Sequence, residues 1–556
     1  MRKLNYLFVL PDLKGFWPSG LAIVSAYLRA RGFNVFCINT TLHAGGIVEV
    51  IRGQIESNNV DVVCTGGMSV YYDEINVVLY AAKLVKPSII RVVGGPVVTS
   101  DPDLSLKLLD YDIGVIGEGE ETMADLAVAL EAGRNLREVA GLIFRADGQV
   151  VRTVPRGALE DLNSLPIPDY EGFEFQTWSR TIRPDPYLSS FSLVDRPIVG
   201  EIITSRSCPF SCTFCYHPLG KKYRTRDLDH VFREIDLLVN KYRVNFLNVQ
   251  DELFSVKKQR MIEFADRIKP YNIIWFPQFR VTDADVGTLR YLKESGMHTV
   301  GLGVESISDK VLTSMRKKIS KAQIELAYAA AREVKVAPIG NLIFGDEEET
   351  DETVDESLSW WKSHPETPLN IGLVKAIPDA KIYRDALERG LIADKETFVR
   401  NKFPTINMSK ISPEKFKWLQ GHVTAAYYGS VLANAFGKVT RSKINAESSA
   451  SDAYVDLEAR CPSCKAVSRY EKFPYLGLAN VRVICRNHDC CRELLLDSRK
   501  VYAPLLSLRR VGLKAACRAR VQILLHTRPQ LVERLRGFGV VNVIYRKLIR
   551  RVLVTG

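Results

Sequence analysis

Two successive series of short apolar runs that alternate with amphipathic helical stretches constrain the fold most. Leu4–Leu10 opens the first series, in residues 1–140, and runs such as Ala337–Phe344 mark the second, in residues 199–392. Because strands that alternate with helices pair in parallel, each series predicts an α/β domain. The first predicts a doubly wound sheet of the Rossmann or flavodoxin type, and the second, with six units, a partial (β/α)6 barrel.

Composition shifts divide the chain into six segments. A good hairpin turn, Asp147-Gly148, marks the end of the first series. The predicted segments are a doubly wound domain (1–140), a hairpin and linker (141–185), the partial barrel (186–410), a helical linker (411–455), a cysteine-rich module (456–500) and a basic helical tail (501–556).

Charge and hydropathy place the chain among cytoplasmic globular proteins. No apolar run approaches the ~18 residues that span a bilayer, and the start, Met1–Leu10, is too short for a signal peptide. Residues 501–556 hold twelve Lys or Arg and one acid, Glu533, so about eleven of the twelve net positive charges belong to the tail. That tail indicates contact with an anionic membrane or nucleic acid, or a helical cap whose charges are solvated.

Cysteines are clustered rather than spread as in a disulfide scaffold. Of eleven, three lie in Cys208-Pro-Phe-Ser-Cys212-Thr-Phe-Cys215, directly after the first predicted barrel strand, and five lie in 461–491. The spacing C-x3-C-x2-C lets one loop bind three irons of a [4Fe–4S] cluster through soft thiolates, which leaves the fourth iron open.

At this motif the sequence resembles the radical S-adenosylmethionine (SAM) superfamily. Further motifs follow in that family's order along the barrel: Gln250-Asp251-Glu252, Arg280, Gly301-x-Gly303-x-Glu305-Ser306, Gly340-x-x-Ile343-x-Gly345 and Glu349-Thr350. The resemblance implies that SAM binds to Phe214, Asp251, Glu252, Arg280, Glu305, Ser306 and Ile343. It also implies reductive cleavage of SAM to a 5′-deoxyadenosyl radical.

A doubly wound domain before such a barrel resembles the cobalamin-binding radical SAM class. Glycine-rich turns after several predicted strands match that class, and they imply cobalamin contacts at Pro18, Gly20, Ser69, Gly94, Gly95, Pro96, Gly117, Glu118 and Gly119. One departure is the loop Pro11–Gly20, which lacks the Asp-x-His-x-x-Gly of many cobalamin proteins. The histidine of this domain, His43, follows the second strand, and we expect it to be a solvated loop residue. Without cobalamin, the domain would be a scaffold that packs on the barrel.

The C-terminal cysteines resemble two knuckles of a zinc ribbon. Cys461-Pro-Ser-Cys464 and Cys485-Arg-Asn-His-Asp-Cys490-Cys491 can meet tetrahedrally around one ion. We choose Cys461, Cys464, Cys485 and Cys490 as the ligands, with Cys491 competing for the last place. The alternatives are an auxiliary iron–sulfur cluster or a decayed site.

The resemblance implies a cobalamin-dependent C-methyltransferase acting on an unactivated carbon. A small-molecule, lipid or peptide substrate is expected, with an electron donor such as flavodoxin or ferredoxin. A radical SAM oxidative cyclase or rearrangement enzyme is the first alternative. A tRNA methylthiotransferase needs three more cysteines in its first domain, where this chain has Cys37 and Cys64. A non-catalytic nucleic-acid-binding module is disfavoured by the intact cysteine triad.

Overall fold

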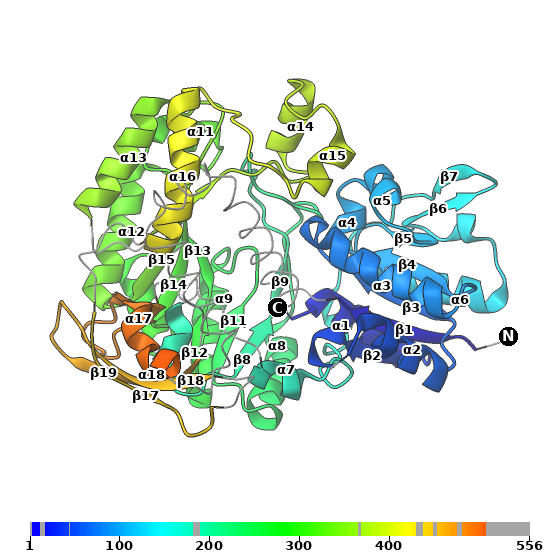
Figure 1. Cartoon of the computed structure of the whole chain (residues 1–556), viewed down its shortest axis with the longest axis horizontal. Helices are drawn as coiled ribbons and strands as arrows, with labels where there is room; N and C mark the ends of the chain where they lie inside the picture. The colour runs from blue at the N-terminus through cyan, green and yellow to red at the C-terminus, as the bar shows by residue number, and fades with distance from the viewer. Residues whose placement is uncertain are drawn as a thin grey trace.

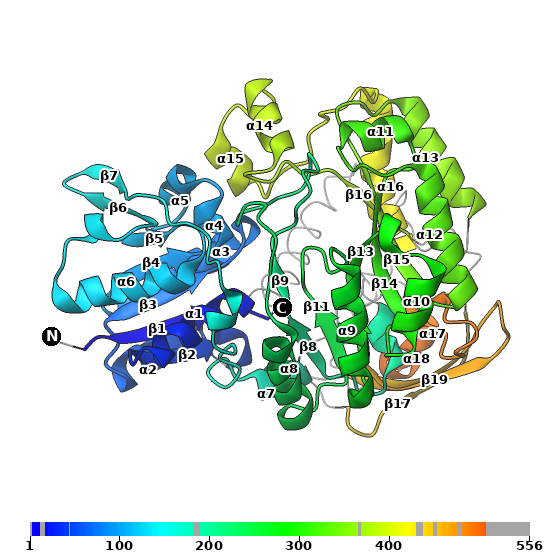
Figure 2. The same ribbon diagram turned by 180° about the vertical axis from the view of Figure 1, so that it is seen from behind.

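The computed structural model shows two large α/β domains side by side, with a small β module beneath the second (Figures 1 and 2). The structure describes residues 3–11, 17–43, 45–181, 189–364, 369–429, 437–448, 453–474 and 481–507. The predicted basic tail from residue 508 onward therefore lies outside the described residues.

The N-terminal domain is a seven-stranded sheet covered by helices on both faces. Its strands are β1 (Asn5–Leu10), β2 (Asn34–Asn39), β3 (Val62–Gly66), β4 (Ile90–Gly94), β5 (Ile113–Val115), β6 (Leu142–Ala146) and β7 (Gln149–Arg152), in the order β2-β1-β3-β4-β5-β6-β7. Its helices are α1 (Ser19–Ala30), α2 (Ile47–Ser57), α3 (Tyr72–Val85), α4 (Pro96–Thr99), α5 (Pro102–Leu108) and α6 (Gly119–Ala132). The first five strands are parallel, as predicted.

The hairpin β6–β7 belongs to this sheet rather than to a linker. Strand β6 pairs antiparallel with β5, in register from Ile113 opposite Phe144 to Val115 opposite Leu142. Leu142 and Phe144 are buried in the domain core. The sheet therefore continues past the predicted boundary at residue 140, because the hairpin carries apolar residues that complete the core.

The second domain is the predicted partial barrel of six β/α units. Its strands are β8 (Val199–Ile202), β11 (Phe246–Val249), β12 (Ile274–Phe276), β13 (Gln278–Arg280), β14 (Thr299–Glu305), β15 (Ala337–Phe344) and β16 (Leu369–Leu373), and a short pair, β9 (Ser205–Arg206) and β10 (Arg224–Thr225), follows β8. Strands β12 and β13 are one strand in sequence, interrupted at Pro277, which has no N–H to donate.

Helices wrap the outside of this barrel (Figure 2). They are α8 (Leu228–Asp236), α9 (Lys258–Ile268), α10 (Val286–Lys293), α11 (Asp309–Ser314), α12 (Lys321–Val334), α13 (Asp351–Ser363) and α16 (Pro413–Gly429); α7 (Phe175–Thr181) precedes the barrel. Two further helices, α14 (Lys381–Glu388) and α15 (Lys395–Arg400), pack against the N-terminal domain. Trp275 on β12 packs against Phe264 on α9, with ring centroids 5.1 Å apart. Successive strand side chains point to opposite faces, so residues next in sequence to an outward-facing residue such as Trp275 face the barrel interior.

The cysteine-rich module begins earlier than predicted. It consists of β17 (Lys438–Ile444), β18 (Tyr454–Arg460), β19 (Val467–Pro474), β20 (Val481–Ile484), β21 (Glu493–Leu496), α17 (Ser498–Val501) and α18 (Ala503–Ser507). Strand β17 lies in the segment predicted as a helical linker. The strand was missed because it is a polar edge strand in which four of seven residues are exposed.

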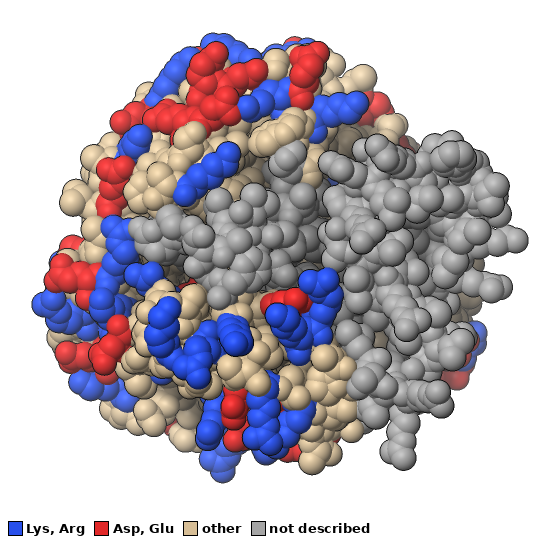
Figure 3. All heavy atoms as spheres, turned by 60° about the vertical axis from the view of Figure 1, so that its left-hand side comes forward, with Lys and Arg blue, Asp and Glu red and all other residues tan. Residues whose placement is uncertain are grey.

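Among the described residues, no helix combines the length and apolar character needed to cross a membrane. Acidic and basic side chains both appear over the described part of the face in Figure 3. The cytoplasmic location stays a prediction.

Candidate cofactor site

The three predicted cluster cysteines lie on one loop at the carboxyl end of the first barrel strand. Cys208, Cys212 and Cys215 are each partly buried. Burial raises the pKa of the Cys208 and Cys212 thiols, and the charges of the other cysteine thiolates raise them further. Three soft sulfur donors on one loop are suited to a metal cluster whose positive charge offsets the repulsion between their thiolates. The donor set therefore fits a [4Fe–4S] cluster with one open iron.

Asp251 holds the turn that leads into this loop. Its two carboxylate oxygens accept hydrogen bonds from the backbone N–H groups of Thr204 (2.6 Å) and Ser205 (3.0 Å) and from both hydroxyls (2.6 and 2.7 Å). Asp251 is 3% exposed, so these four bonds occupy it. The structure thus gives Asp251 a positioning role toward the cluster loop rather than a free carboxylate for SAM.

The next residue, Glu252, is the exposed member of the acidic pair. Its carboxylate lies 3.2 Å from Nδ1 of His217, two residues after the last cluster cysteine. Hydrogen bonds with Cys215 and Glu252 raise the pKa of His217 to about 9. Of this pair, Glu252 is therefore the residue whose carboxylate faces the cluster loop.

Lys317 is a buried cation that lies beside the predicted SAM residues. The sequence motifs do not reveal it. It is 9% exposed, and its Nζ donates to Oε1 of Glu305 at 2.8 Å. The same Nζ lies 5.7 Å from the Phe214 ring centroid. A Cβ on Gly303 would stand 2.6 Å from Nζ, so this glycine leaves the space that Lys317 occupies. In sequence, Lys317 is hidden in the basic run Arg316-Lys317-Lys318.

Arg280 fixes the backbone on which Lys317 stands. Its guanidinium donates to the carbonyls of Lys317 (2.7 Å) and Lys318 (3.2 Å). The guanidinium also lies 3.7 Å from the ring centroid of Phe210, within the cluster loop. Arg280 thus connects the third barrel strand, the cluster loop and the Lys317 segment.

The remaining predicted SAM residues lie at the carboxyl ends of β14 and β15. Glu305 adopts a left-handed backbone conformation, φ +68°, which is strained for a residue other than glycine. Ser306 is buried, and its hydroxyl accepts from the Ser308 N–H at 3.2 Å. Ile343 is partly buried on the inward face of β15, beside Gly372. These positions share one end of the barrel with the cysteines.

We expect Lys317 to donate a charge-assisted hydrogen bond to the SAM carboxylate. Since such a bond contributes about 1.5–3 kcal/mol, Lys317→Met should weaken SAM binding by roughly 10- to 100-fold. Equilibrium dialysis of the cluster-loaded protein against labelled SAM measures this change. Lys318→Met, which removes an exposed neighbour, is the matched control. Equal SAM affinity in both variants would contradict the assignment.

Glu349, in the Glu-Thr motif before α13, makes stability depend on pH. Burial raises the pKa of its carboxyl to about 8; Oε2 accepts from the Gly345 N–H at 2.6 Å, and Oε1 has no protein partner. The unfolded chain loses this proton near pH 4.5 and the folded chain only near 8, so stability falls as pH rises between these values.

Glu349→Gln should remove that loss. At pH 8.5 we expect a higher apparent Tm, which corresponds to a gain on the order of 2 kcal/mol in the free energy of unfolding. At pH 4.5 we expect little change. Scanning calorimetry at both values measures it. A lower Tm for the variant at pH 8.5 would contradict this prediction, because it would show that the ionised Glu349 carboxylate has the hydrogen-bond partners it needs.

The predicted cobalamin residues gather at one edge of the N-terminal sheet. They follow the carboxyl ends of β1, β3, β4 and β5, which are neighbours in the sheet. Pro18 and Gly20 start α1, Ser69 starts a 3-10 turn after β3, Gly94, Gly95 and Pro96 join β4 to α4, and Gly117, Glu118 and Gly119 lead into α6.

Two glycines on this edge face open space. No heavy atom lies within 4 Å of where a Cβ would stand on Gly20 or Gly117. Gly95 and Gly117 have φ values of +83° and +82°, which glycine adopts without strain. Open glycines at the carboxyl edge of a doubly wound sheet fit a nucleotide-bearing cofactor such as cobalamin.

Glu118 joins the two domains instead of standing free. Its carboxylate accepts from Arg206 (2.8 Å) and Arg224 (2.8 Å) of the barrel, while Glu120 binds Arg206 at 2.5 Å. All four side chains are buried or nearly so, 4–11% exposed. Because Arg206 lies two residues before Cys208, this ion network ties the cobalamin-type loops to the cluster loop.

His43 lies away from these loops. Its Nε2 is 2.8 Å from a carboxylate oxygen of Glu174, and its side chain is 37% exposed. It stands in the loop after β2, as expected. Part of the loop after β1, residues 12–16, lies outside the described residues.

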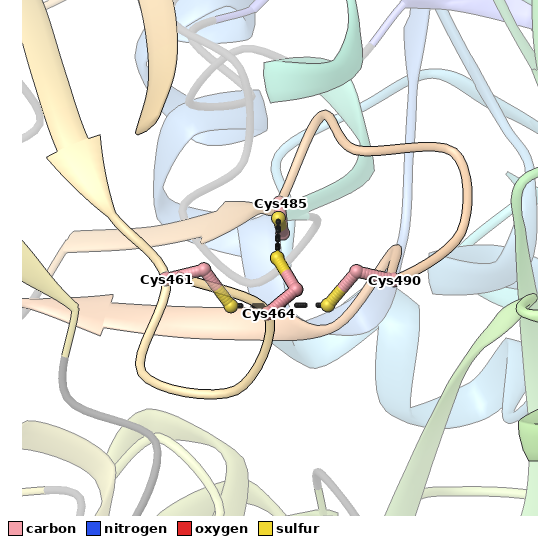
Figure 4. A group of neighbouring side chains, drawn as sticks. All are labelled: Cys461, Cys464, Cys485 and Cys490. Carbon is pink, nitrogen blue, oxygen red and sulfur yellow. Dashed lines mark hydrogen bonds between the residues drawn. The ribbon is translucent and has the colours of Figure 1, made fainter. Parts of the chain in front are cut away.

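The C-terminal cysteines converge as a group of four. The Sγ atoms of Cys461, Cys464, Cys485 and Cys490 all lie within 4.8 Å of one another (Figure 4). Although partial burial opposes the shift, hydrogen bonds from the Ala466 N–H and the other thiols lower the pKa of Cys464 to about 7. Cys491 is outside the group, with Sγ 3.6 Å from the carbonyls of Asn487 and His488. Four converging sulfurs fit one tetrahedral metal ion.

Comparisons with known proteins agree with this arrangement. The radical SAM superfamily model matches residues 202–360, and the B12 binding domain model matches residues 14–127. An uncharacterized methyltransferase of Pyrococcus horikoshii is 29% identical over 348 residues, 62% of this chain and 72% of that protein. The anaerobic magnesium-protoporphyrin IX monomethyl ester cyclase of Rubrivivax gelatinosus is 27% identical over 414 residues, 71% and 72%.

A solved structure shows the same fold. The radical SAM methyltransferase TsrM of Kitasatospora setae, with cobalamin and a [4Fe–4S] cluster bound, superposes with a TM-score of 0.58 at 18% identity, covering 70% of this chain and 75% of that one. The fold and site thus define a radical SAM enzyme with a cobalamin-binding domain. The chain thus contains a radical SAM domain and a B12 binding domain, and the cofactors of these domains are a [4Fe–4S] cluster, SAM and cobalamin. Such an enzyme needs a small-molecule substrate and an electron donor.

Proposed function

We propose that this enzyme is a cobalamin-dependent C-methyltransferase. The observation that carries the proposal is direct contact between the two cofactor loops. The Ser100 hydroxyl, at the end of α4, donates to the Tyr216 hydroxyl at 3.0 Å, and Tyr216 directly follows the cluster ligand Cys215. A methyl donor held by the first domain is thereby brought next to the place where SAM is cleaved.

When bound, the cluster and SAM supply a radical that removes hydrogen from the substrate, and cobalamin supplies the methyl group. In this proposal Cys208, Cys212 and Cys215 hold the cluster. Glu252 and Lys317 bind the amino and carboxylate ends of SAM. The Arg206–Glu118 network keeps the domains at a fixed spacing.

Product analysis distinguishes this function from a cyclase. The reconstituted enzyme is incubated without oxygen with reductant and SAM carrying a deuterated methyl group. A methyltransferase is expected to form S-adenosylhomocysteine, because a methyl group leaves SAM, in addition to 5′-deoxyadenosine. Formation of 5′-deoxyadenosine with no S-adenosylhomocysteine would contradict methyl transfer.

The second candidate is a radical SAM oxidative cyclase. Its support is the similarity to magnesium-protoporphyrin IX monomethyl ester cyclases, which extends over 71% of this chain in one relative. The product pattern of 5′-deoxyadenosine alone is the outcome that favours it.

We also propose that Cys461, Cys464, Cys485 and Cys490 bind a structural zinc ion. Support comes from the convergence of four thiols in a module built of short strands. Cys461 and Cys485 are buried in the module core together with Tyr470 and Leu494. A closed set of four protein ligands is typical of structural rather than catalytic zinc.

A further inference from the structure

A layer of polar side chains, four carboxamides and one carboxyl, lines the inside of the partial barrel. The strand registers form two pairs, Glu201 beside Asn248 and Asn341 beside Asn370, and they place Gln278 beside Gly301 on the strands between these pairs. We call Glu201, Asn248, Gln278, Asn341 and Asn370 the amide layer.

The packing of neighbouring residues shows that this layer faces inward. Leu247, Phe279 and Leu342, which alternate with layer residues, are buried in the same core cluster as the surrounding helices. Successive strand residues point to opposite faces, so the layer points to the interior. A Cβ on Gly301 would stand 2.2 Å from Oε1 of Gln278, so the Gln278 side chain extends across this glycine along the inner wall.

The amide layer is accessible to solvent although it lies inside the barrel. Gln278 and Asn341 are exposed, whereas Phe279 and Leu342 beside them are 2% and 0% exposed. The interior of a closed (β/α) barrel is normally filled by branched apolar side chains. Here polar side chains face an accessible interior.

The layer lies directly below the predicted SAM residues. Arg280 and Ile343 follow Gln278 and Asn341 by two residues on the same strands. Two strand residues span about 6.6 Å. A molecule hydrogen-bonded to the amide layer therefore lies next to bound SAM, where the substrate has to be.

The cysteine module closes the far end and contributes one side chain. Ile484 on β20 packs with Ala337 at the start of β15, and Arg482, on the same face of β20, donates to Oδ1 of Asn370 at 2.5 Å. The amide of Asn370 in turn donates to Asn341 at 3.1 Å. The layer thus has a polar end wall rather than an open apolar channel.

Charge in the layer is limited. Burial raises the pKa of Glu201 to about 7, and the carboxyl accepts from the Gln250 side chain and the Trp17 N–H. Arg482 is the cation at the other edge, and it is engaged by Asn370. Four of the five layer residues are carboxamides, each of which offers both donors and acceptors. The strand registers place two apolar residues among them, Phe276 beside Asn248 and Ile339 beside Gly301.

We propose that the amide layer binds the substrate, and that this substrate is a polar molecule with several uncharged hydroxyl or amide groups rather than a lipid or a porphyrin. The inference rests on the proposed function, because it names the substrate class of that same site. An apolar molecule would displace water from the carboxamides without replacing its hydrogen bonds, and sites built to hydrogen-bond a substrate reject such molecules strongly.

Ligand-observed NMR on the holoenzyme tests this proposal. The protein is loaded with cluster, hydroxocobalamin and SAM, without reductant, and titrated with maltotriose, with the capped tripeptide acetyl-Ala-Gly-Ala-amide and with 1-octanol. Gln278→Leu/Asn341→Leu, the layer variant, replaces the two exposed carboxamides of the layer by apolar side chains. Asn240→Leu/Gln259→Leu, on exposed helical positions, is the matched control. Cluster and corrinoid content verify that each variant is folded.

We expect saturable millimolar binding of at least one polar probe, weakened at least about tenfold by the layer variant and unchanged in the control. Binding of maltotriose indicates hydroxyl recognition, and binding of the peptide indicates amide recognition. Tighter binding of 1-octanol than of both polar probes, no binding of either polar probe, or equal binding by the layer variant would overturn the inference. The product assay for S-adenosylhomocysteine fails or succeeds independently of these titrations.

Discussion

Cys212→Ala is expected to abolish 5′-deoxyadenosine formation. Two remaining thiolates do not hold a cubane, so iron should fall from about four atoms per chain to near background after anaerobic reconstitution. Iron analysis, the visible spectrum and chromatography of SAM products measure the effect together.

Cys64→Ala is the matched control for this variant. Cys64 is buried in β3 of the N-terminal sheet and is 3% exposed, and burial alone raises its pKa. Its loss should cost stability of about 1 kcal/mol but leave iron content and SAM cleavage intact. Normal SAM cleavage by Cys212→Ala would contradict the placement of the cluster.

Cys485→Ser is expected to remove one zinc ion per chain and to unfold the C-terminal module. The loss should be cooperative, because binding energy at a structural zinc site is folding energy. Ile484 and Arg486 next to this cysteine bind Ser192 below the barrel, so the barrel should lose stability too. Elemental analysis and limited proteolysis after residue 429 measure both effects.

Cys491→Ser is the matched control, because Cys491 directly follows the proposed ligand Cys490 but lies outside the four-sulfur group. It should retain one zinc ion. Iron in place of zinc at the four cysteines would favour an auxiliary cluster. Loss of metal in Cys491→Ser but not in Cys490→Ser would contradict the ligand assignment.

The α/β architecture was predictable because local pattern and tertiary structure agree. Leu4–Leu10 and Ala337–Phe344 are apolar runs in buried parallel strands, and both appear nearly at the expected bounds. Edge strands were harder to predict. Strand β17 is mostly polar, with Val439 and Ile444 as its apolar residues, and its pairing with β18 makes it a strand.

The candidate site was predictable where a local motif determines the chemistry. It was less predictable where the fold determines which residues meet. The C-x3-C-x2-C loop is local, so spacing alone points to a cluster. Lys317 reaches the site because Gly303 leaves it room, a long-range relation that no local pattern contains. Likewise Asp251 and Glu118 are occupied by Thr204 and by Arg206, partners that sequence spacing does not indicate. The proposed contact of the basic tail with membrane or nucleic acid concerns residues outside those described.

The most direct test that this protein binds both a cluster and cobalamin is its visible spectrum after anaerobic reconstitution with iron, sulfide and hydroxocobalamin, followed by desalting. Corrinoid bands at about one cobalamin per chain are expected beside the iron–sulfur absorption, since the loops around Gly20 and Gly117 leave open space and the α4 end contacts the cluster loop. Retention of the cluster with no corrinoid would contradict it and leave the first domain as a scaffold.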